Sequence, residues 1–225
     1  YRYELMEEYY PEEFKKLKEY VAQGRWNVTG SAYENGDVNV PSPEALFRNI
    51  LYGNSYFEKT FGKRSTDIFL PDCFGFGWAL PSIARHANLS GFTTQKLTWS
   101  SAYGIPFDLG RWYGVDGRWI YASLDARSYV AELDKVRKNR AVSQKLKANL
   151  KKYNLPFTYI FHGTGDRGGS PKEESVATVC RELAENEAEK SDVLSAAADQ
   201  VFRDMEAELT PEQKASLPFW NTELV

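Results

Sequence analysis

DIFLPDCFGFGWALP, residues 67–81, decides the fold, because an apolar run ends there in an acidic, aromatic and glycine-rich turn. Residues 68–70 are typical of a short buried strand, and Pro71 ends its hydrogen-bonded ladder. Gly75 then permits a tight backbone. Asp72 is therefore expected at the carboxyl end of a strand, which is the edge of an α/β sheet where ligands bind and catalytic side chains gather. A carboxylate that caps the next helix is the structural alternative.

The segments on either side predict an α/β domain with a largely parallel sheet, because helical and extended patterns alternate through the first three quarters of the chain. The segment that opens with Ser42 and Pro43 carries the strongest helix signal, an N-cap followed by proline at the first helical position. We expect further helices at 12–23, 79–86 and 126–152, and further strands at 26–28, 91–96, 118–123 and 157–161.

From about Lys172 onward the sequence is charged and rich in alanine and glutamate, which predicts helices packed on the domain. We therefore expect an α/β part at 1–170 and a helical part at 171–225. The second part is either the end of the same domain or the beginning of a helical one. Apolar residues continue up to the last position, so the chain is expected to be a piece of a larger region.

Composition excludes several classes of function. The 225 residues carry a net charge of −3, and the pI is about 5.6, so no electrostatic signal for nucleic acid is present. The basic cluster at 135–140 is interleaved with helix-forming residues and is interpreted as a solvated helix face. No apolar segment is long enough to span a bilayer. Cys73 and Cys180 match no metal-ligand spacing and are interpreted as free thiols, Cys73 as a small packing residue.

Four motifs together resemble the bacterial α-mannosidases of glycoside hydrolase family 38. They are YYPEEFKKLKEYVAQGRW, PSPEALFRNILYGNSYFEKTFG, LPDCFGFGWALPSIARHANLSGFTTQKLTW and GTGDRGGSP, in that order. The resemblance covers nearly the whole chain. It implies a retaining glycosidase that acts on terminal α-mannose of mannose-containing glycans. It also implies one zinc ion that holds sugar hydroxyls, in a catalytic domain with a seven-stranded β/α arrangement.

The same resemblance assigns roles to individual residues. Asp72 matches the family's nucleophile and zinc ligand, and Phe74 matches the aromatic residue beside the bound sugar. Asp166 is expected to be the acid/base carboxyl group, although its neighbour Arg167 replaces a glycine and a cation there would lower the pKa of a general acid. Lys96 matches a basic residue near the sugar, and a strand-end lysine in solvent is the alternative.

Further residues fit substrate contact less specifically. Asp116 lies in a segment that resembles a substrate-lining loop, although Val-Asp-Gly is also a good turn. Trp112, Tyr113 and Trp99 are candidates for stacking on sugars, although aromatic side chains also fill cores. Without the resemblance, the glycines of the Asp166 loop also spell the dinucleotide fingerprint G-x-G-x-x-G, but no strand is expected after the following helix to complete a βαβ unit.

The histidines limit what this chain can do by itself. A catalytic zinc site uses three or four protein ligands, and the chain has only His86 and His162, neither in a zinc motif. The resemblance places the other ligands outside the chain. We therefore expect a central piece of a mannosidase catalytic region that is inactive in isolation. A non-catalytic carbohydrate-binding or scaffold domain is the alternative. The sequence leaves the localisation open, and by analogy with the family a periplasmic or cytoplasmic location in a bacterium is expected.

Overall fold

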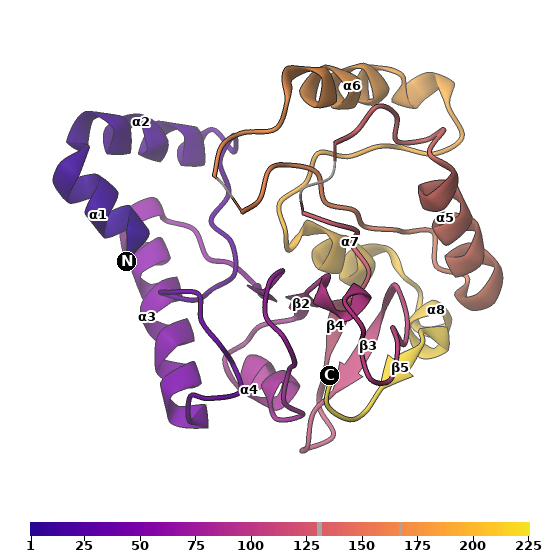
Figure 1. Cartoon of the computed structure of the whole chain (residues 1–225), viewed down its shortest axis with the longest axis horizontal. Coiled ribbons are helices and arrows are strands. Elements are labelled where there is room, and N and C mark those ends of the chain that lie inside the picture. The colour runs from indigo at the N-terminus through magenta and orange to yellow at the C-terminus, as the bar shows by residue number, and fades with distance from the viewer. Residues whose placement is uncertain (130–131, 167) are drawn as a thin grey trace.

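A five-stranded, mostly parallel sheet forms the centre of the molecule (Figure 1). The computed structural model describes residues 1–129, 132–166 and 168–225. The strand order is β1-β2-β4-β3-β5. Strands β1, β2 and β4 run parallel to one another, whereas β3 is antiparallel to β4 and parallel to β5. The strands are β1 Asp67–Phe69, β2 Gly91–Thr93, β3 Leu109–Tyr113, β4 Trp119–Ser123 and β5 Phe219–Trp220. The α/β class is confirmed, but the seven-stranded arrangement is not.

Eight α-helices are present in the described part of the chain. In Figure 1, α1 to α3 lie on the left, α5, α6 and α8 lie on the right, and the sheet lies between them. Among the described residues, no helix combines the length and apolar character that crossing a bilayer requires. The bounds are α1 Arg2–Tyr9, α2 Pro11–Ala22, α3 Pro43–Phe61, α4 Leu80–His86, α5 Arg140–Tyr153, α6 Glu173–Ala184, α7 Gln200–Glu208 and α8 Pro211–Ser216.

Helix α3 shows how local sequence sets the helix ends. The Ser42 hydroxyl accepts a hydrogen bond from the Ala45 amide at 3.2 Å, and Pro43 occupies the first turn. Gly62 ends the helix in the left-handed conformation, with φ of 64°. The N-cap and first-turn proline predicted for this helix are confirmed.

The two faces of the sheet bury two separate apolar cores, because successive residues of a strand point to opposite faces. In β4, Ile120 packs with α4 residues in one core. Its neighbour Tyr121 packs in the other core with Phe202 and Met205 of α7. The second core also includes Leu217, just after α8. Residues near the C-terminal end of the chain therefore help to fix the sheet.

Two predicted strands are wrong, 26–28 and 157–161, because neither segment forms a ladder. The first leads to Gly30, whose amide donates to the Asp67 carboxylate and not to a neighbouring strand. In the second, the Phe157 carbonyl accepts from the Asn149 side chain, and the Phe161 amide donates to Ala126. Side chains and isolated backbone hydrogen bonds therefore satisfy the backbone groups that would form a ladder in a strand.

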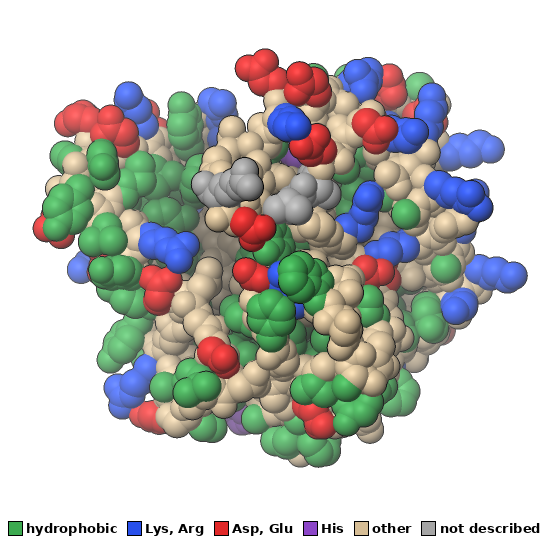
Figure 2. All heavy atoms as spheres, viewed as in Figure 1, with side chains coloured by type: hydrophobic (Ala, Val, Ile, Leu, Met, Phe, Trp, Pro, Cys, Tyr) green, Lys and Arg blue, Asp and Glu red, His purple; other side chains and the backbone are tan. Residues whose placement is uncertain are grey.

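The predicted helix at 126–152 is confirmed only in its second half, since α5 begins at Arg140. Asn139 caps α5 by accepting from the amides of the next turn. The basic cluster at 135–140 mostly precedes the helix, so the interpretation as a helix face is wrong, although Lys135, Lys138 and Arg140 are exposed. The side chain of Arg137 is only 9% exposed and pairs with Glu182 at 3.4 Å. Figure 2 shows exposed Lys and Arg side chains over α5 instead.

Candidate active site

Asp72 lies directly beyond β1, as predicted, in a loop that several side chains hold in place. The Gln95 amide, which follows β2, donates to the Pro71 carbonyl at 3.2 Å. The Asn39 amide donates to the Gly75 carbonyl at 2.9 Å. Gly75 has φ of 92°, which side chains disfavour. The loop after β1 is therefore attached to the loop after β2, at the shared carboxyl edge of the two parallel strands.

This attachment brings Lys96 against Asp72. The Lys96 ammonium lies 2.7 Å from the Asp72 Oδ1 atom, and the Lys96 side chain is only 4% exposed, whereas that of Asp72 is 58% exposed. The ammonium also lies 3.7 Å from the centre of the Trp99 ring and 5.1 Å from that of Phe74. A nearly buried cation thus holds an accessible carboxylate beside two aromatic rings. Near the centre of the face in Figure 2, hydrophobic and acidic side chains lie side by side.

Tyr129 connects this ion pair to the second predicted carboxylate. Its hydroxyl is 3.4 Å from the Lys96 ammonium and donates to Asp166 Oδ1 at 3.2 Å. The Asp72 and Asp166 carboxylates are linked through the Lys96 ammonium and the Tyr129 hydroxyl by contacts of 2.7, 3.4 and 3.2 Å. The linked oxygens of the two carboxylates therefore lie no farther apart than the sum of these distances. The separation of about 5 to 5.5 Å between the two carboxyl groups of retaining glycosidases falls within this limit. Arg167, the feature expected to disturb Asp166, lies outside the described residues.

Sequence reasoning missed Tyr129. The residue lies in a segment that was expected to be helical, and nothing in its local pattern marks it as part of a site. Its role depends on contacts to residues 33 and 37 positions away in the chain. The aromatic residue Trp99, in contrast, was recognised as a candidate for stacking and lies against the Lys96 ammonium.

Opposing effects act on the charge of Lys96. Burial alone lowers the pKa of its ammonium, but the hydrogen bonds to Asp72 and Tyr129 outweigh burial and raise the pKa above the ordinary value. The pKa of the Tyr129 phenol is also raised, by burial first and by its bond to Asp166. Lys96 is therefore a permanent positive charge at neutral pH, and Tyr129 a neutral hydrogen-bond donor.

Asp116 does not join these residues. It lies in the turn before β4, at the opposite edge of the parallel strands. Its carboxylate accepts from the Ser82 hydroxyl at 2.6 Å and contacts His86 at 3.2 Å. Hydrogen bonds from Ser82 and from the Arg118 amide lower the pKa of Asp116. The cluster attaches the turn to α4, which agrees with the turn interpretation and with a structural role for His86.

Trp112 and Tyr113 also lie apart from Asp72. Trp112 is fully buried in β3, and its indole donates to the Thr222 carbonyl at 2.8 Å. It has no exposed face on which a sugar could stack. Tyr113 ends the same strand beside the Asp116 turn, and its ring contacts Phe219 of β5. Both aromatic residues therefore support the sheet in this structure.

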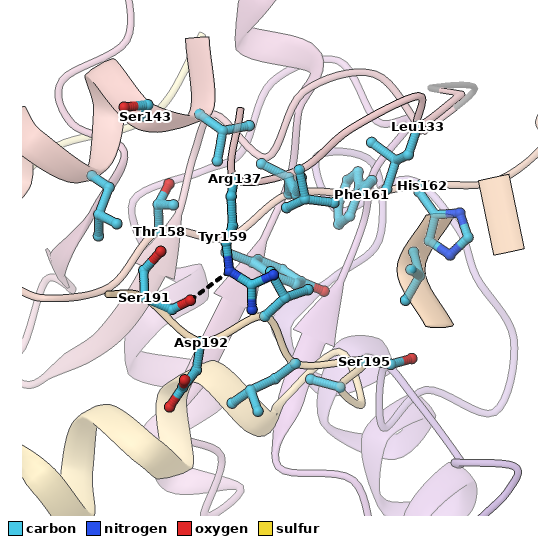
Figure 3. A pocket seen from close by; sticks show the side chains of 18 of the residues that line it. Leu133, Arg137, Ser143, Thr158, Tyr159, Phe161, His162, Ser191, Asp192 and Ser195 are labelled. Atoms are coloured by element: carbon cyan, nitrogen blue, oxygen red, sulfur yellow. Dashed lines mark hydrogen bonds between the residues drawn. The ribbon is translucent and has the colours of Figure 1, made fainter. Parts of the chain in front are cut away.

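A cavity of about 490 Å³ lies between α5, α6 and the segments 158–162 and 191–196. Tyr129 and His162 line it together with apolar side chains from α5 and α6. Figure 3 shows Arg137 reaching into it, where its guanidinium donates to the Ser191 carbonyl at 2.7 Å. The buried Nδ1 atom of His162 has no hydrogen-bond partner among the described residues. His162 thus lines a cavity beside the site but contacts neither carboxylate in the recorded interactions.

The interpretation of the Asp166 loop as a dinucleotide-binding loop is wrong, because the elements around the loop do not match that motif. The glycines of the Asp166 loop follow an extended segment that forms no ladder, and α6 begins only at Glu173. A dinucleotide loop requires a sheet strand immediately before it and a helix N-terminus immediately after it. Cys73 packs against the apolar core, as expected of a small packing residue.

Comparisons with known proteins settle the family. Residues 1–223 match the domain model described as "Glycosyl hydrolases family 38 N-terminal domain". The chain belongs to glycosyl hydrolase family 38. Alpha-mannosidase G of Dictyostelium discoideum is 35% identical over 170 residues, which are 75% of this chain and 15% of that protein. The alpha-mannosidase of Saccharomyces cerevisiae is 29% identical over 79% of this chain and 16% of its own length.

Solved structures agree with the family at the level of the fold. An alpha-mannosidase from Enterococcus faecalis V583 superposes with a TM-score of 0.68 at 20% identity, over 97% of this chain and 24% of that protein. A 4-alpha-glucanotransferase from Thermococcus litoralis gives a TM-score of 0.62 at 13% identity, over 92% of this chain and 32% of that protein. The chain thus spans about a sixth of the curated family 38 relatives and about a quarter of the solved one.

The zinc ion implied by family 38 does not fit these residues alone. The structure, over the residues it describes, groups no three His, Cys, Asp or Glu side chains around a position that could hold a metal ion. A catalytic zinc site needs about three protein ligands. Asp72 could supply one, but its recorded partner is the Lys96 ammonium.

Proposed function

We infer that this chain carries the two reacting carboxyl groups of a retaining α-mannosidase, Asp72 as the nucleophile and Asp166 as the acid/base. One observation carries the proposal. At the carboxyl edge of the sheet, the buried Lys96 ammonium pairs with Asp72 and, through the Tyr129 hydroxyl, is linked to Asp166. Membership of family 38 and the alpha-mannosidase relatives support mannosides as the substrates.

The proposed reaction has two steps, in which each carboxyl group acts twice. Asp72 attacks the anomeric carbon while the Asp166 carboxyl group protonates the departing glycosidic oxygen. A covalent mannosyl–Asp72 ester results, and the aglycone leaves as an alcohol. Asp166, now a carboxylate, takes a proton from a water molecule that attacks the same carbon. The ester bond breaks, mannose leaves with its original configuration, and both carboxyl groups return to their starting states.

The aromatic residues and Lys96 support this chemistry in defined ways. Phe74 and Trp99 are both about two-thirds exposed, and their ring centres are 6.2 Å apart. They offer apolar faces on which a sugar ring can stack. Lys96 orients the Asp72 carboxylate, because its nearly buried ammonium contacts Asp72 Oδ1 at 2.7 Å.

The proposal concerns the full-length protein, and the piece described here is proposed to be inactive alone. Asp72 would be one ligand of the family's zinc ion, and the remaining ligands would come from segments outside this chain. A chelator-sensitive mannosidase activity of residues 1–225 by themselves would contradict this part of the proposal.

Covalent trapping tests the nucleophile directly. A fluorinated mannosyl fluoride, which forms the ester quickly and loses it slowly, should label a single peptide that contains Asp72 in the full-length protein, as read by mass spectrometry. Asp72→Asn should abolish labelling and lower kcat by about a thousandfold or more. Asp116→Asn is the matched control and should be labelled at Asp72 at the normal rate.

Two outcomes would separate the alternatives. Labelling of another carboxylate would remove Asp72 from the nucleophile role. Binding of mannosides to the full-length protein without turnover or labelling would instead favour the alternative, a non-catalytic carbohydrate-binding or scaffold domain.

A further inference from the structure

The Asp166 carboxyl group is exposed, and among the described residues its one recorded hydrogen bond comes from the Tyr129 hydroxyl, at 3.2 Å from Oδ1. The backbone fixes where the residue lies. Asp166 has φ of 63°, which residues with a side chain rarely adopt, and the Thr164 hydroxyl closes the loop on the Ser170 carbonyl at 2.7 Å. An exposed side chain can still rotate about its own bonds. The orientation of the carboxyl group therefore depends on Tyr129.

Tyr129 is itself held in place, and the direction of its hydroxyl hydrogen follows from its contacts. Its carbonyl oxygen lies against Gly163, where a Cβ atom would be 3.6 Å away, and its ring centre lies 5.2 Å from the Lys96 ammonium. An ammonium has only hydrogen-bond donors, so at their 3.4 Å contact the Tyr129 oxygen accepts from Lys96. The single hydrogen of the phenol is therefore directed to Asp166. The raised pKa of the phenol, caused first by burial, keeps this hydrogen in place.

This donation distinguishes the two oxygens of the Asp166 carboxyl group. A protonated carboxyl group has one carbonyl oxygen, which accepts hydrogen bonds, and one hydroxyl, which donates. Since Tyr129 donates to Oδ1, the proton of the acid is placed on Oδ2. No contact of Oδ2 is recorded among the residues that the structure describes. This oxygen is thus the one that can face a substrate.

We propose that Tyr129 is a positioning residue that holds Asp166 with its proton on Oδ2, facing the departing glycosidic oxygen. This inference rests on the proposed role of Asp166 as the acid/base. In the first step the Oδ2–H bond breaks, the proton joins the glycosidic oxygen, and the bond from that oxygen to the anomeric carbon breaks. In the second step Oδ2 takes the proton of the attacking water molecule. Tyr129 keeps its own hydrogen in both steps.

Steady-state kinetics of the full-length Tyr129→Phe variant, which lacks only the hydroxyl, tests this. For a mannoside with a poor leaving group, kcat should fall by about 10- to 100-fold, which is part of what a general acid supplies. KM should change by less than about twofold, because the lost contact acts in the transition state. An activated aryl mannoside, which departs without a proton, should keep its kcat within about threefold. A merely structural role would slow both substrates alike.

Two further variants make the result specific. Tyr121→Phe removes a hydroxyl that donates to Glu206 at 2.6 Å in the core, and the ratio of the two rates per folded molecule should stay at the wild-type value. Tyr129→Phe combined with Asp166→Asn should show the same dependence on the leaving group as Asp166→Asn alone. A residue that acts only through Asp166 has no effect of its own once that carboxyl group is lost.

Equal losses with both substrates in Tyr129→Phe overturn the inference, and so does the absence of any loss. A further loss with the poor leaving group in the double variant also overturns it, because Tyr129 would then act without Asp166. Covalent labelling of Asp72 and the contrast between substrates in Asp166→Asn need no contribution from Tyr129. Their failure would count against the proposed function separately.

Discussion

The two ends of β1 each carry an aspartate, and their surroundings give the two carboxyl groups opposite properties. Asp67, at the amino end, is fully buried and accepts from the Ser65 hydroxyl at 2.6 Å and from the Gly30 amide at 3.3 Å. No cation pairs with it in the recorded contacts, and its Oδ2 atom has no partner among the described residues. Asp72, beyond the carboxyl end, is mostly exposed and pairs with a buried lysine.

The difference shows how an α/β sheet gives two aspartates five positions apart opposite surroundings. At the amino end of the strands, short helices and turns close over the carboxylates and use them as hydrogen-bond acceptors. At the carboxyl end, the loops after β1 and β2 leave a carboxylate that pairs with Lys96 and faces solvent beside exposed rings. Reactive groups gather at this second edge in folds of this type.

The largest expected effect at the carboxyl edge, after loss of Asp72 itself, is that of Asp166→Asn. A missing general acid should lower kcat/KM by about 10² to 10⁴-fold for mannosides with a poor leaving group, and far less for an activated aryl mannoside that departs without a proton. Steady-state kinetics with the two substrates measures the contrast. Asp116→Asn, at the amino edge, should affect both substrates equally and weakly. Equal loss with both substrates in Asp166→Asn would exclude Asp166 as the acid.

The burial of Asp67 should make the free energy of unfolding depend on pH. Burial first, and Asp199 in addition, raise its pKa to about 6 from 3.8. The carboxyl group of Asp67 therefore binds a proton more tightly in the folded state than in the unfolded state. Its contribution to the free energy of unfolding is fully present below pH 4 and is lost as the pH rises through about 6. Relative to Asp67→Asn, the wild type should lose about 3 kcal/mol of unfolding free energy between pH 4 and pH 7.

Urea unfolding of both proteins at several pH values measures this difference. Parallel pH curves would show that Asp67 is solvated or paired in solution. The contrast with the exposed, lysine-paired Asp72 would then lose its basis.

Sequence alone predicted the position of Asp72 beyond a strand end, because the signals for it are local. The apolar run, Pro71 and the glycines define a strand end around Asp72, and the motifs that resemble family 38 named Phe74, Lys96 and Asp166, which lie together here. Helix α3 was predictable for the same reason, since Ser42 and Pro43 act within one turn.

The remaining features depend on distant contacts that no local pattern encodes. Strand β5 has two residues, and only its pairing with β3 makes it a strand. Residues 157–161 have strand-like composition but lack a neighbouring ladder. Trp112 and Asp116 lie in a motif with suitable residue types, yet the antiparallel turn between β3 and β4 carries them to the other edge.

The smallest of these effects concerns packing at the amino edge. Gly91, the first residue of β2, lies opposite Asp67, and a Cβ atom there would lie 2.0 Å from Phe202 Cδ2, in a ring that is fully buried. Gly91→Ala should therefore destabilise the fold by about 1 to 3 kcal/mol, the usual cost of overpacking.

Activity per folded molecule should be kept in this variant, because the substitution is remote from Asp72 and the strand register is unchanged. Gly36→Ala is the matched control, since a Cβ atom there meets nothing within 4 Å. Unfolding midpoints and kcat for the two variants provide the test. A loss of kcat without a loss of stability in Gly91→Ala would mean that the amino edge takes part in catalysis, and the separation of the two ends of β1 would fail.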